Sequence, residues 1–314
     1  MPKDKIGIVG LGRVGSSIAF STMLSGVVEE LVLLDVDQSR AEGEAMDLAH
    51  ALPYMPTSNV YAGTYDDLKD TEVIVVAAGT ARRPGETRLD LASRNYGIAK
   101  EITTELQKIK DAVILVVSNP VDVITTYMSK KLDPNKTGKV FGSGTALDTA
   151  RFRYIIADQF KVDAHNVHAY MIGEHGDSQV PIWSSAKIAL IDIDKYPNPS
   201  NAILTDTLKD EIYQAVVKAG AEVIKRKGAT HFGIAQVTNY LVNAILRDQN
   251  SILCVSTIPH GEYGINDVAL SLPALVGNCG ACQRIVPVLS DKEVEALNSS
   301  AEKLRSMCRE LGIL

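Results

Sequence analysis

One histidine of the chain lies in a setting that exposes an imidazole to a small molecule. His175 is flanked by Gly173 and Gly176 and comes soon after the apolar residues 169–172. An imidazole titrates near neutral pH, which suits it to taking up and releasing a proton during a reaction. A lone histidine more often has a structural role, so His175 predicts acid–base chemistry only where other groups support it.

Three further segments carry groups of the required kinds. Asp148 and Arg151 are three residues apart, which places them on one face of a helix expected over residues 147–160. Asn119 comes at the end of an expected strand, and Arg88 follows another strand. A carboxylate can orient an imidazole and stabilise its cation, and a guanidinium can bind a carboxylate through two parallel hydrogen bonds. With these groups in the chain, His175 is better explained as part of a reactive site than as a lone structural histidine.

A glycine-rich loop near the N-terminus predicts a dinucleotide site. Gly10, Gly12 and Gly15 follow an apolar strand at residues 6–9 and open a helical pattern at residues 16–24. The first glycine permits a tight turn, the second lets a pyrophosphate approach the backbone, and the third allows close helix packing. Without its context, the same spacing is often an incidental glycine turn.

The second expected strand ends in an acid that strengthens this interpretation. Asp35 stands 20 residues after Gly15, where a carboxylate can accept hydrogen bonds from both ribose hydroxyls of adenosine. The alternative is a solvated aspartate beside a structural turn. Because a carboxylate repels a 2′-phosphate, the loop and Asp35 predict NAD rather than NADP.

Together and in this order, the motifs resemble those of the L-lactate/L-malate dehydrogenase family. The resemblance runs from the glycine loop at Gly10 through the C-terminal helix and covers essentially the whole chain. It implies an NAD-dependent oxidoreductase that interconverts a small L-2-hydroxy acid and its 2-oxo acid by hydride transfer.

The resemblance implies a role for each polar residue. His175 would exchange the proton of the reacting oxygen, and Asp148 would hold the other ring nitrogen. Arg151 would bind the substrate carboxylate, and Arg88 would polarise the carbonyl when a lid closes.

Two more positions carry roles that rest on the resemblance alone. Asn119 would hydrogen-bond the reacting oxygen and lie near the nicotinamide ribose, and the bond between Asn119 and Pro120 is expected to be cis. Thr230 would line the pocket around the substrate's C3 substituent. The simpler alternatives are a strand-end cap for Asn119 and helix packing for Thr230.

The choice of acid depends on one lid residue. Arg82 occupies the position two before Pro84 where lactate enzymes of this family usually carry Gln and malate enzymes carry Arg. A guanidinium there would pair with the second carboxylate of malate or oxaloacetate, so Arg82 favours that pair. Thr230 and much of residues 111–187 are more similar to bacterial lactate dehydrogenases, and a solvated Arg82 would return the prediction to lactate.

Two alternatives remain open. Arg153 and His168 match positions that bind a sugar bisphosphate activator in allosteric bacterial lactate enzymes, but an interface anion site or a structural role suits them equally. A catalytically silent NAD-binding redox sensor is the remote alternative to an enzyme. It would be expected to lack one of four groups, and all four are present: His175, Asp148, Arg151 and Arg88.

The elements that must position these residues change character near residue 142. Apolar runs alternate with helical patterns before that point, which predicts an α/β, doubly wound (Rossmann) parallel sheet of six strands over residues 1–142. These strands are expected at residues 6–9, 31–35, 60–62, 73–77, 113–117 and 140–141. Residues 143–314 are expected to form a mixed α+β catalytic domain with long amphipathic helices and strands near 252–258 and 268–271.

Composition excludes several other classes. The chain has 314 residues, 46% of them hydrophobic, and a net charge of −6, which predicts about two globular domains and disfavours a nucleic-acid surface. No apolar run is long enough for a membrane span, so we expect a cytoplasmic protein. We also expect a homo-oligomer, a tetramer or a dimer.

The cysteines predict neither a disulfide framework nor a metal site. The four are Cys254, Cys279, Cys282 and Cys308, all in apolar surroundings, and they are expected to be reduced core residues. Cys279 and Cys282 have CxxC spacing, but no second pair of ligands accompanies them.

Overall fold

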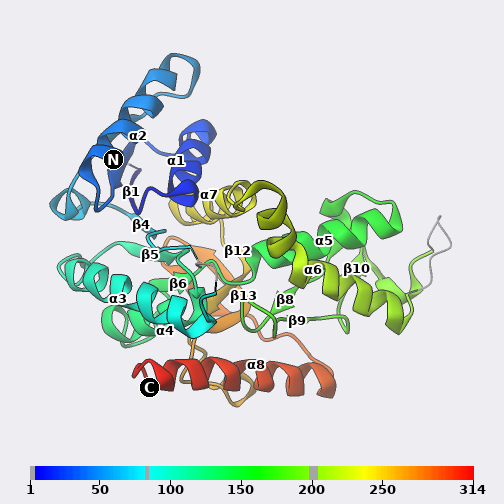
Figure 1. The fold of residues 1–314 in the computed structure, drawn as a ribbon. Coiled ribbons are helices and arrows are strands. Elements are labelled where there is room, and N and C mark those ends of the chain that lie inside the picture. The colour runs from blue at the N-terminus through cyan, green and yellow to red at the C-terminus, as the bar shows by residue number, and fades with distance from the viewer. Residues whose placement is uncertain (1–3, 82–84, 198–203) are drawn as a thin grey trace.

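The computed structural model describes residues 4–81, 85–197 and 204–314, and a single nine-stranded sheet lies at its centre (Figure 1). The strand order is β14-β13-β12-β6-β5-β4-β1-β2-β3. Six of these strands are parallel: β1 (Lys5–Val9), β2 (Glu30–Leu34), β3 (Asn59–Ala62), β4 (Val73–Val76), β5 (Val113–Val116) and β6 (Val140–Gly142). Their order is that of a Rossmann sheet, and its direction of winding reverses between β1 and β4, so a ligand crevice is expected at the carboxyl ends of these two strands.

Helices cover both faces of the parallel strands, which is why the strands are almost continuously apolar. Ile8 on β1 belongs to the core beneath α1 (Arg13–Ser25), α2 (Gln38–Ala51) and α7 (Phe232–Leu246). Val9, the next residue, belongs to the core beneath α3 (Arg88–Leu106) and α4 (Val121–Leu132). Figure 1 shows α1 and α7 on one side of the sheet and α3 and α4 on the other.

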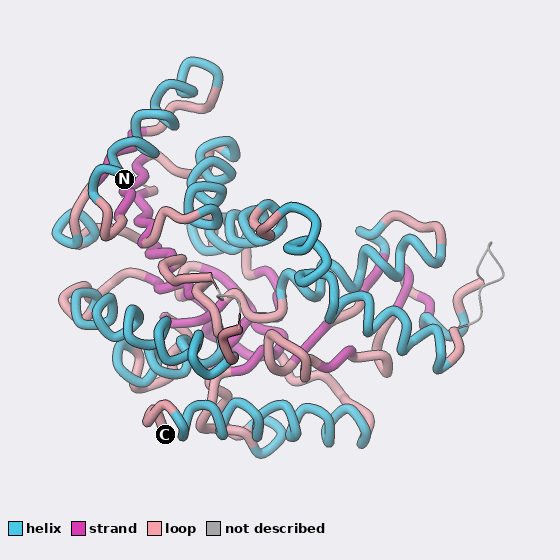
Figure 2. The backbone as a smooth tube through the Cα atoms, viewed as in Figure 1, coloured by secondary structure: helices cyan, strands magenta, loops and turns pink. Residues whose placement is uncertain are grey.

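The second half of the chain contributes three antiparallel strands to the same sheet. They are β12 (Ser251–Thr257), β13 (Leu270–Gly277) and β14 (Gly280–Arg284), and Ser256 of β12 pairs with Gly142 of β6. The sequence predicts strands in this half of the chain, and the structure adds them to the edge of the parallel sheet. The tube in Figure 2 shows these strands continuing beside the parallel ones.

The remaining elements surround this extension. The helices are α5 (Ala146–Phe160), α6 (Asp206–Lys227) and α8 (Asp291–Glu310). Five short strands form two small sheets: β7 (Val167–His168), β8 (Met171–Ile172), β9 (Val180–Pro181), β10 (Lys187–Ile188) and β11 (Ile191–Asp192). The apolar stripe of α8 belongs to a core shared with α4, β9 and β13. Short 3-10 turns lie at Leu52–Tyr54, Tyr65–Leu68, Ala164–Asn166, Ile193–Lys195 and Glu262–Gly264.

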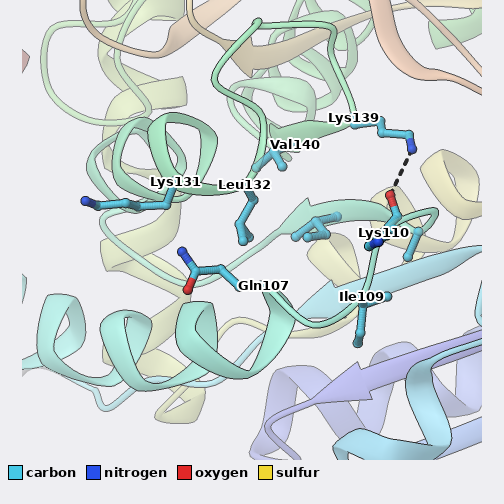
Figure 3. A pocket seen from close by; sticks show the side chains of 9 residues that line it. Gln107, Ile109, Lys110, Lys131, Leu132, Lys139 and Val140 are labelled. Carbon is cyan, nitrogen blue, oxygen red and sulfur yellow. Dashed lines mark hydrogen bonds between the residues drawn. The ribbon is translucent and has the colours of Figure 1, made fainter.

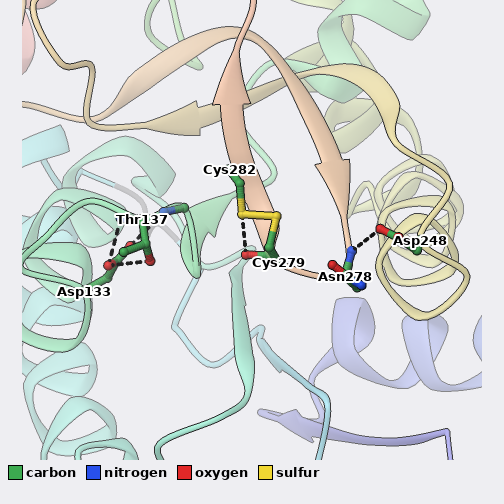
Figure 4. Close-up of a disulfide and its surroundings, with 7 residues drawn as sticks. Asp133, Thr137, Asp248, Asn278, Cys279 and Cys282 are labelled. Carbon is green, nitrogen blue, oxygen red and sulfur yellow. Dashed lines mark hydrogen bonds between the residues drawn. A yellow bond between two sulfur atoms is a disulfide. The ribbon is translucent and has the colours of Figure 1, made fainter.

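The prediction of four reduced core cysteines is wrong for one pair. Cys279 and Cys282 form a disulfide across the turn of the β13–β14 hairpin (Figure 4). The apolar neighbours of this segment suggested core packing, but Cys279 is exposed and the burial belongs to Gly280 and Ala281. Gly280 has a φ of 90°, and this tight turn brings the two Cα atoms to 6.0 Å, within reach of a disulfide.

The other two cysteines are as predicted. Cys254 and Cys308 are buried free thiols. No helix within the described residues is long and apolar enough to cross a membrane.

Candidate active site

The loop that carries His175 is fixed to the extended sheet. Gly173, just after β8, exchanges two backbone hydrogen bonds of 2.9 Å with Ser271 of β13. Its φ is 84°, a conformation that favours glycine, and a side chain there would come within 2.9 Å of Ser300 on α8. Beyond Gly173 the backbone N–H of Glu174 donates to Ser300 of α8, and the side chain of His175 reaches α5.

The structure brings His175, Asp148 and Arg151 together. The His175 Nδ1 lies 2.5 Å from one carboxylate oxygen of Asp148, and the Arg151 guanidinium donates to the other oxygen at 2.9 Å. Asp148 is in the first turn of α5 and is only 2% exposed, whereas the side chains of His175 and Arg151 are 27% and 18% exposed. The carboxylate is thus enclosed, and its two cationic partners reach the surface of the site.

The electrostatics of this cluster favour a protonated imidazole. The negative charge of Asp148 raises the pKa of His175 to about 9, although burial acts in the opposite direction. Burial alone would raise the pKa of Asp148, but the charges and hydrogen bonds of His175 and Arg151 outweigh it and hold that pKa below its ordinary value. At neutral pH the arrangement can hold a proton for delivery to a bound oxygen.

A second buried carboxylate lies behind the His175 loop and was not singled out by the sequence. One oxygen of Asp122 accepts the backbone N–H of His175 at 2.7 Å, and the other accepts the Ser256 hydroxyl at 2.6 Å. Burial raises the pKa of Asp122 to about 6, against the hydrogen bonds from Ser256 and His175. The only available signal was an aspartate directly after the Asn119-Pro120-Val121 segment, which by itself is typical of a helix N-terminus.

Arg88 lies at the start of α3 and contacts the His175 loop. Its guanidinium donates to the carboxylate of Asp177 at 2.6 Å, and both side chains are more than half exposed. The preceding turn is held by an ion pair between Glu86 and Arg94. Sequence reasoning missed Asp177 as a partner of Arg88, although it belongs to the same motif as His175. Arg82 lies outside the described residues.

Asn119 lies at the carboxyl end of β5, on the edge of the sheet that faces the glycine loop. The Asn119–Pro120 peptide bond is cis, as the resemblance implied. The Asn119 carbonyl accepts a hydrogen bond from the Asn95 side chain at 2.7 Å, and the residue is exposed. Thr230 lies half-buried in the connection between α6 and α7, and the next residue, His231, pairs with Ser17 of α1 at 2.9 Å.

The glycine loop forms a cradle that fits a dinucleotide. A side chain at Gly10 would collide with the Ala78 backbone at 2.3 Å, and one at Gly15 would collide with the Gly10 carbonyl at 1.9 Å. At Gly12 an added Cβ meets nothing within 4 Å, so packing within the chain does not explain this glycine. Gly12 is also the N-cap of α1 and has no side chain to satisfy the first N–H groups, which suits a phosphate ligand.

Asp35 is oriented toward this cradle. One carboxylate oxygen accepts the backbone N–H of Leu11 at 2.7 Å, and the other accepts that of Asp37 at 3.0 Å. The Asp35 carboxylate is therefore held against the glycine loop, where it could hydrogen-bond to an adenosine ribose.

Two other features lie apart from this cluster. Arg153 donates to the Ala169 carbonyl at 2.9 Å and stacks on the Tyr170 ring, while His168 is exposed on β7. A cavity of about 240 Å³ lined by Lys110, Lys131 and Lys139 lies at the amino ends of β5 and β6, opposite the edge that carries Asn119 (Figure 3).

The chain matches known sequences along its whole length. Residues 4–142 match the NAD binding domain of lactate/malate dehydrogenases, and residues 145–311 match their alpha/beta C-terminal domain. An L-lactate dehydrogenase of Thermoanaerobacter sp. (strain X514) is 43% identical over 311 residues, covering 99% of this chain and 100% of that protein. An L-lactate dehydrogenase of Acetivibrio thermocellus is 42% identical over 310 residues, covering 98% of each.

Solved structures agree with this similarity. A lactate dehydrogenase from a Medee basin deep-sea metagenome library superposes with a TM-score of 0.92 at 38% identity, covering 99% of this chain and 100% of that one.

A doubly wound dinucleotide-binding sheet joined to an α/β half defines a nicotinamide-dependent dehydrogenase. The chain belongs to the lactate/malate dehydrogenase family, and NAD is its cofactor.

Proposed function

We propose that the protein catalyses the reversible NAD-dependent oxidation of L-lactate to pyruvate, with His175 as the acid–base group. The observation that carries the chemistry is the Asp148 carboxylate, which divides its two oxygens between His175 and Arg151. The names of the relatives, at 42–43% identity over nearly the whole chain, support lactate as the acid.

His175 exchanges the proton of the reacting oxygen. Its Nδ1 faces Asp148, which leaves Nε2 as the nitrogen for the substrate. In reduction of the oxo acid, protonated His175 gives its proton to the carbonyl oxygen. In oxidation, neutral His175 takes the hydroxyl proton. Asp148 orients the ring and stabilises its cation, as in other His–Asp pairs.

The other polar residues bind and orient the acid. Arg151 adjoins the His–Asp pair and remains charged, so it binds the substrate carboxylate. Arg88 leaves Asp177 and polarises the carbonyl when the lid closes. Asn119 binds the reacting oxygen and the nicotinamide side of the cofactor, and Thr230 borders the C3 substituent.

The glycine loop and Asp35 hold the cofactor. Gly10 and Gly15 keep the loop tight, and Gly12 leaves room for the pyrophosphate. Asp35 would accept hydrogen bonds from the ribose hydroxyls. When bound, NAD would supply the hydride acceptor for the hydroxy acid, and NADH would supply the hydride for the oxo acid.

Malate and oxaloacetate are the second candidate pair, because Arg82 matches the malate-type residue of the lid. A guanidinium facing the C3 substituent would pair with the second carboxylate of oxaloacetate. Beside the methyl group of pyruvate, the same guanidinium would be buried without a partner. The ratio of kcat/KM for pyruvate and oxaloacetate with NADH separates the two candidates. We expect pyruvate to be preferred, and a preference for oxaloacetate would overturn the lactate proposal.

Three further proposals concern the whole molecule. The NAD-binding domain spans residues 1–142, and the catalytic domain spans residues 143–314. The protein is cytoplasmic. It assembles as a homo-oligomer, either a tetramer or a dimer. Light scattering of the purified protein tests the assembly, and a monomer would contradict it.

A further inference from the structure

A buried carboxylate joins three segments of the site without reaching its surface. Asp122 is 2% exposed, and each of its oxygens has one partner: the backbone N–H of His175 at 2.7 Å and the Ser256 hydroxyl at 2.6 Å. A charge buried this deeply is costly unless hydrogen bonds satisfy it. The only printed contact between Asp122 and the Asp148–His175–Arg151 cluster is this backbone N–H; among the described residues, no side chain of the cluster hydrogen-bonds to Asp122.

The position of Asp122 in the fold links the two halves of the protein. It lies in the first turn of α4, three residues after Asn119, whose carbonyl is held by Asn95 at 2.7 Å. His175 and Ser256 belong to the second half, in the loop after β8 and on β12. The Asp122 hydrogen bonds therefore connect the segment that carries Asn119 to the loop that carries His175.

We propose that Asp122 is a positioning residue for His175: its carboxylate fixes the His175 backbone relative to Asn119 and places a negative charge behind the imidazole. This inference rests on the proposed acid–base role of His175. It assigns no contact between Asp122 and the substrate or cofactor.

The chemistry of the two partners explains why a carboxylate occupies this position. A backbone N–H can only donate, and the Ser256 hydroxyl donates as well, so both atoms facing them must be acceptors. An amide would keep the shape and one acceptor but lose the charge. A leucine of similar size would lose both acceptors and leave the His175 N–H unpaired.

Among the described residues, the charged and titratable groups around Asp122 lie on the His175 loop, α8, α3 and β12. The loop contributes His175 and Glu174, and α8 contributes the Cys308 thiol. On α3, Tyr96 packs against Tyr127 of α4, and β12 contributes the neutral Ser256. Of these groups, only His175 is a cation at neutral pH, so loss of the Asp122 charge should act mainly on the imidazole.

Two variants of Asp122 and one matched control separate position from charge. Asp122→Asn keeps the shape and removes the charge, and Asp122→Leu removes both acceptors. Asp133→Asn is the control, because Asp133 is also buried and also accepts backbone N–H groups, from Thr137 and Gly138, but at the opposite end of α4.

The first measurement uses the protein without cofactor or substrate. The protein is labelled with ¹⁵N-histidine for NMR. The ring and amide resonances of His175 are identified by their absence from the spectrum of His175→Ala, and their chemical shifts are then followed against pH. In the wild type we expect the His175 amide resonance to respond to pH near 6, as its acceptor titrates. This response should vanish in Asp122→Asn and persist in Asp133→Asn. The ring pKa should fall by about 0.5 or more in Asp122→Asn, because a nearby negative charge favours the cation.

The second measurement is steady-state kinetics with pyruvate and NADH. We expect Asp122→Leu to lower kcat by about 10- to 100-fold, which is the rate loss expected when a reacting group is slightly misplaced. NADH binding, followed by fluorescence, should change by less than about 3-fold. Asp122→Asn should retain more activity than Asp122→Leu, and the fall of its kcat/KM with rising pH should begin at a lower pH than in the wild type.

An unchanged His175 amide and ring titration in Asp122→Asn overturns the inference, as does a kcat in folded Asp122→Leu equal to that of Asp133→Asn. Failure of the proposed function has a different signature. In that case the resonances still respond to Asp122→Asn, but wild-type and His175→Ala proteins show the same turnover.

Discussion

The Nδ1 of His175 lies 2.5 Å from the Asp148 carboxylate, although 27 residues separate the two in the chain. The charge of that carboxylate raises the pKa of His175 to about 9, so the imidazole is protonated at neutral pH. The resting site therefore holds the proton that an oxo acid needs and lacks the free base that a hydroxy acid needs.

This relationship predicts opposite pH dependences for the two directions. Reduction uses protonated His175, so kcat/KM for the oxo acid should be constant at neutral pH and fall about tenfold per pH unit well above 9. Oxidation uses the neutral ring, so kcat/KM for the hydroxy acid should rise with pH until about 9. Initial rates in both directions from pH 6 to 10 check the signs. Parallel profiles would contradict the assignment.

Removal of the acid–base group should strongly lower turnover and spare cofactor binding. We expect His175→Ala to lower kcat by about 10²- to 10⁴-fold, the usual contribution of such a group. Fluorescence titration should give a Kd for NADH close to that of the wild type, because the glycine loop is a separate segment. Asp148→Asn should lower kcat/KM by less than His175→Ala does. If His175→Ala retains more than about a tenth of wild-type turnover, the role is assigned to the wrong residue.

Asp35 should select NADH over NADPH. Its carboxylate is oriented by the backbone N–H groups of Leu11 and Asp37, and it would face the 2′-phosphate of NADPH. We expect kcat/KM with NADH to exceed that with NADPH by about 100-fold or more, and Asp35→Ser to narrow the ratio. Equal use of both cofactors by the wild type would show that Asp35 does not read the ribose.

The two candidate substrates predict different outcomes for Arg82→Gln. With lactate and pyruvate as the pair, the change should leave pyruvate reduction intact or raise it, because no unpaired guanidinium lies near the methyl group. With malate and oxaloacetate as the pair, it should lower kcat/KM for oxaloacetate by about 100-fold or more, through loss of a charge-assisted hydrogen bond. Equal loss on both acids would mean that Arg82 serves lid closure alone.

The four cysteines should divide into two reactivity classes. Burial raises the pKa of Cys254 to about 12 and that of Cys308 to about 11, which suppresses their thiolates at neutral pH. After mild reduction, iodoacetamide should label Cys279 and Cys282 in the folded protein, and label the buried pair only after unfolding. Peptide mass spectrometry measures each site. Labelling of Cys279 without any reductant would contradict the disulfide.

Local sequence patterns were sufficient for the parts of the site that lie within one element and its neighbours. The three glycines and the spacing to Asp35 predicted a dinucleotide loop, and in the structure the Asp35 carboxylate accepts the backbone N–H of Leu11 in that loop. The spacing of Asp148 and Arg151 predicted that they share a helix face, and the structure shows them paired on that face. Alternating apolar strands and helices likewise predicted the doubly wound parallel sheet.

Contacts between distant segments were decided by the tertiary structure. The pairing of His175 with Asp148 was expected only through the family resemblance, and the contacts of Asp122 with His175 and Ser256 were not foreseen. Strands were expected near residues 252–258 and 268–271, but their addition to the parallel sheet was not foreseen, nor was the turn that joins Cys279 to Cys282. Periodicity and spacing report which face of an element is buried, but which elements meet depends on packing across the whole chain, and that packing placed the proton-transfer group beside its partners.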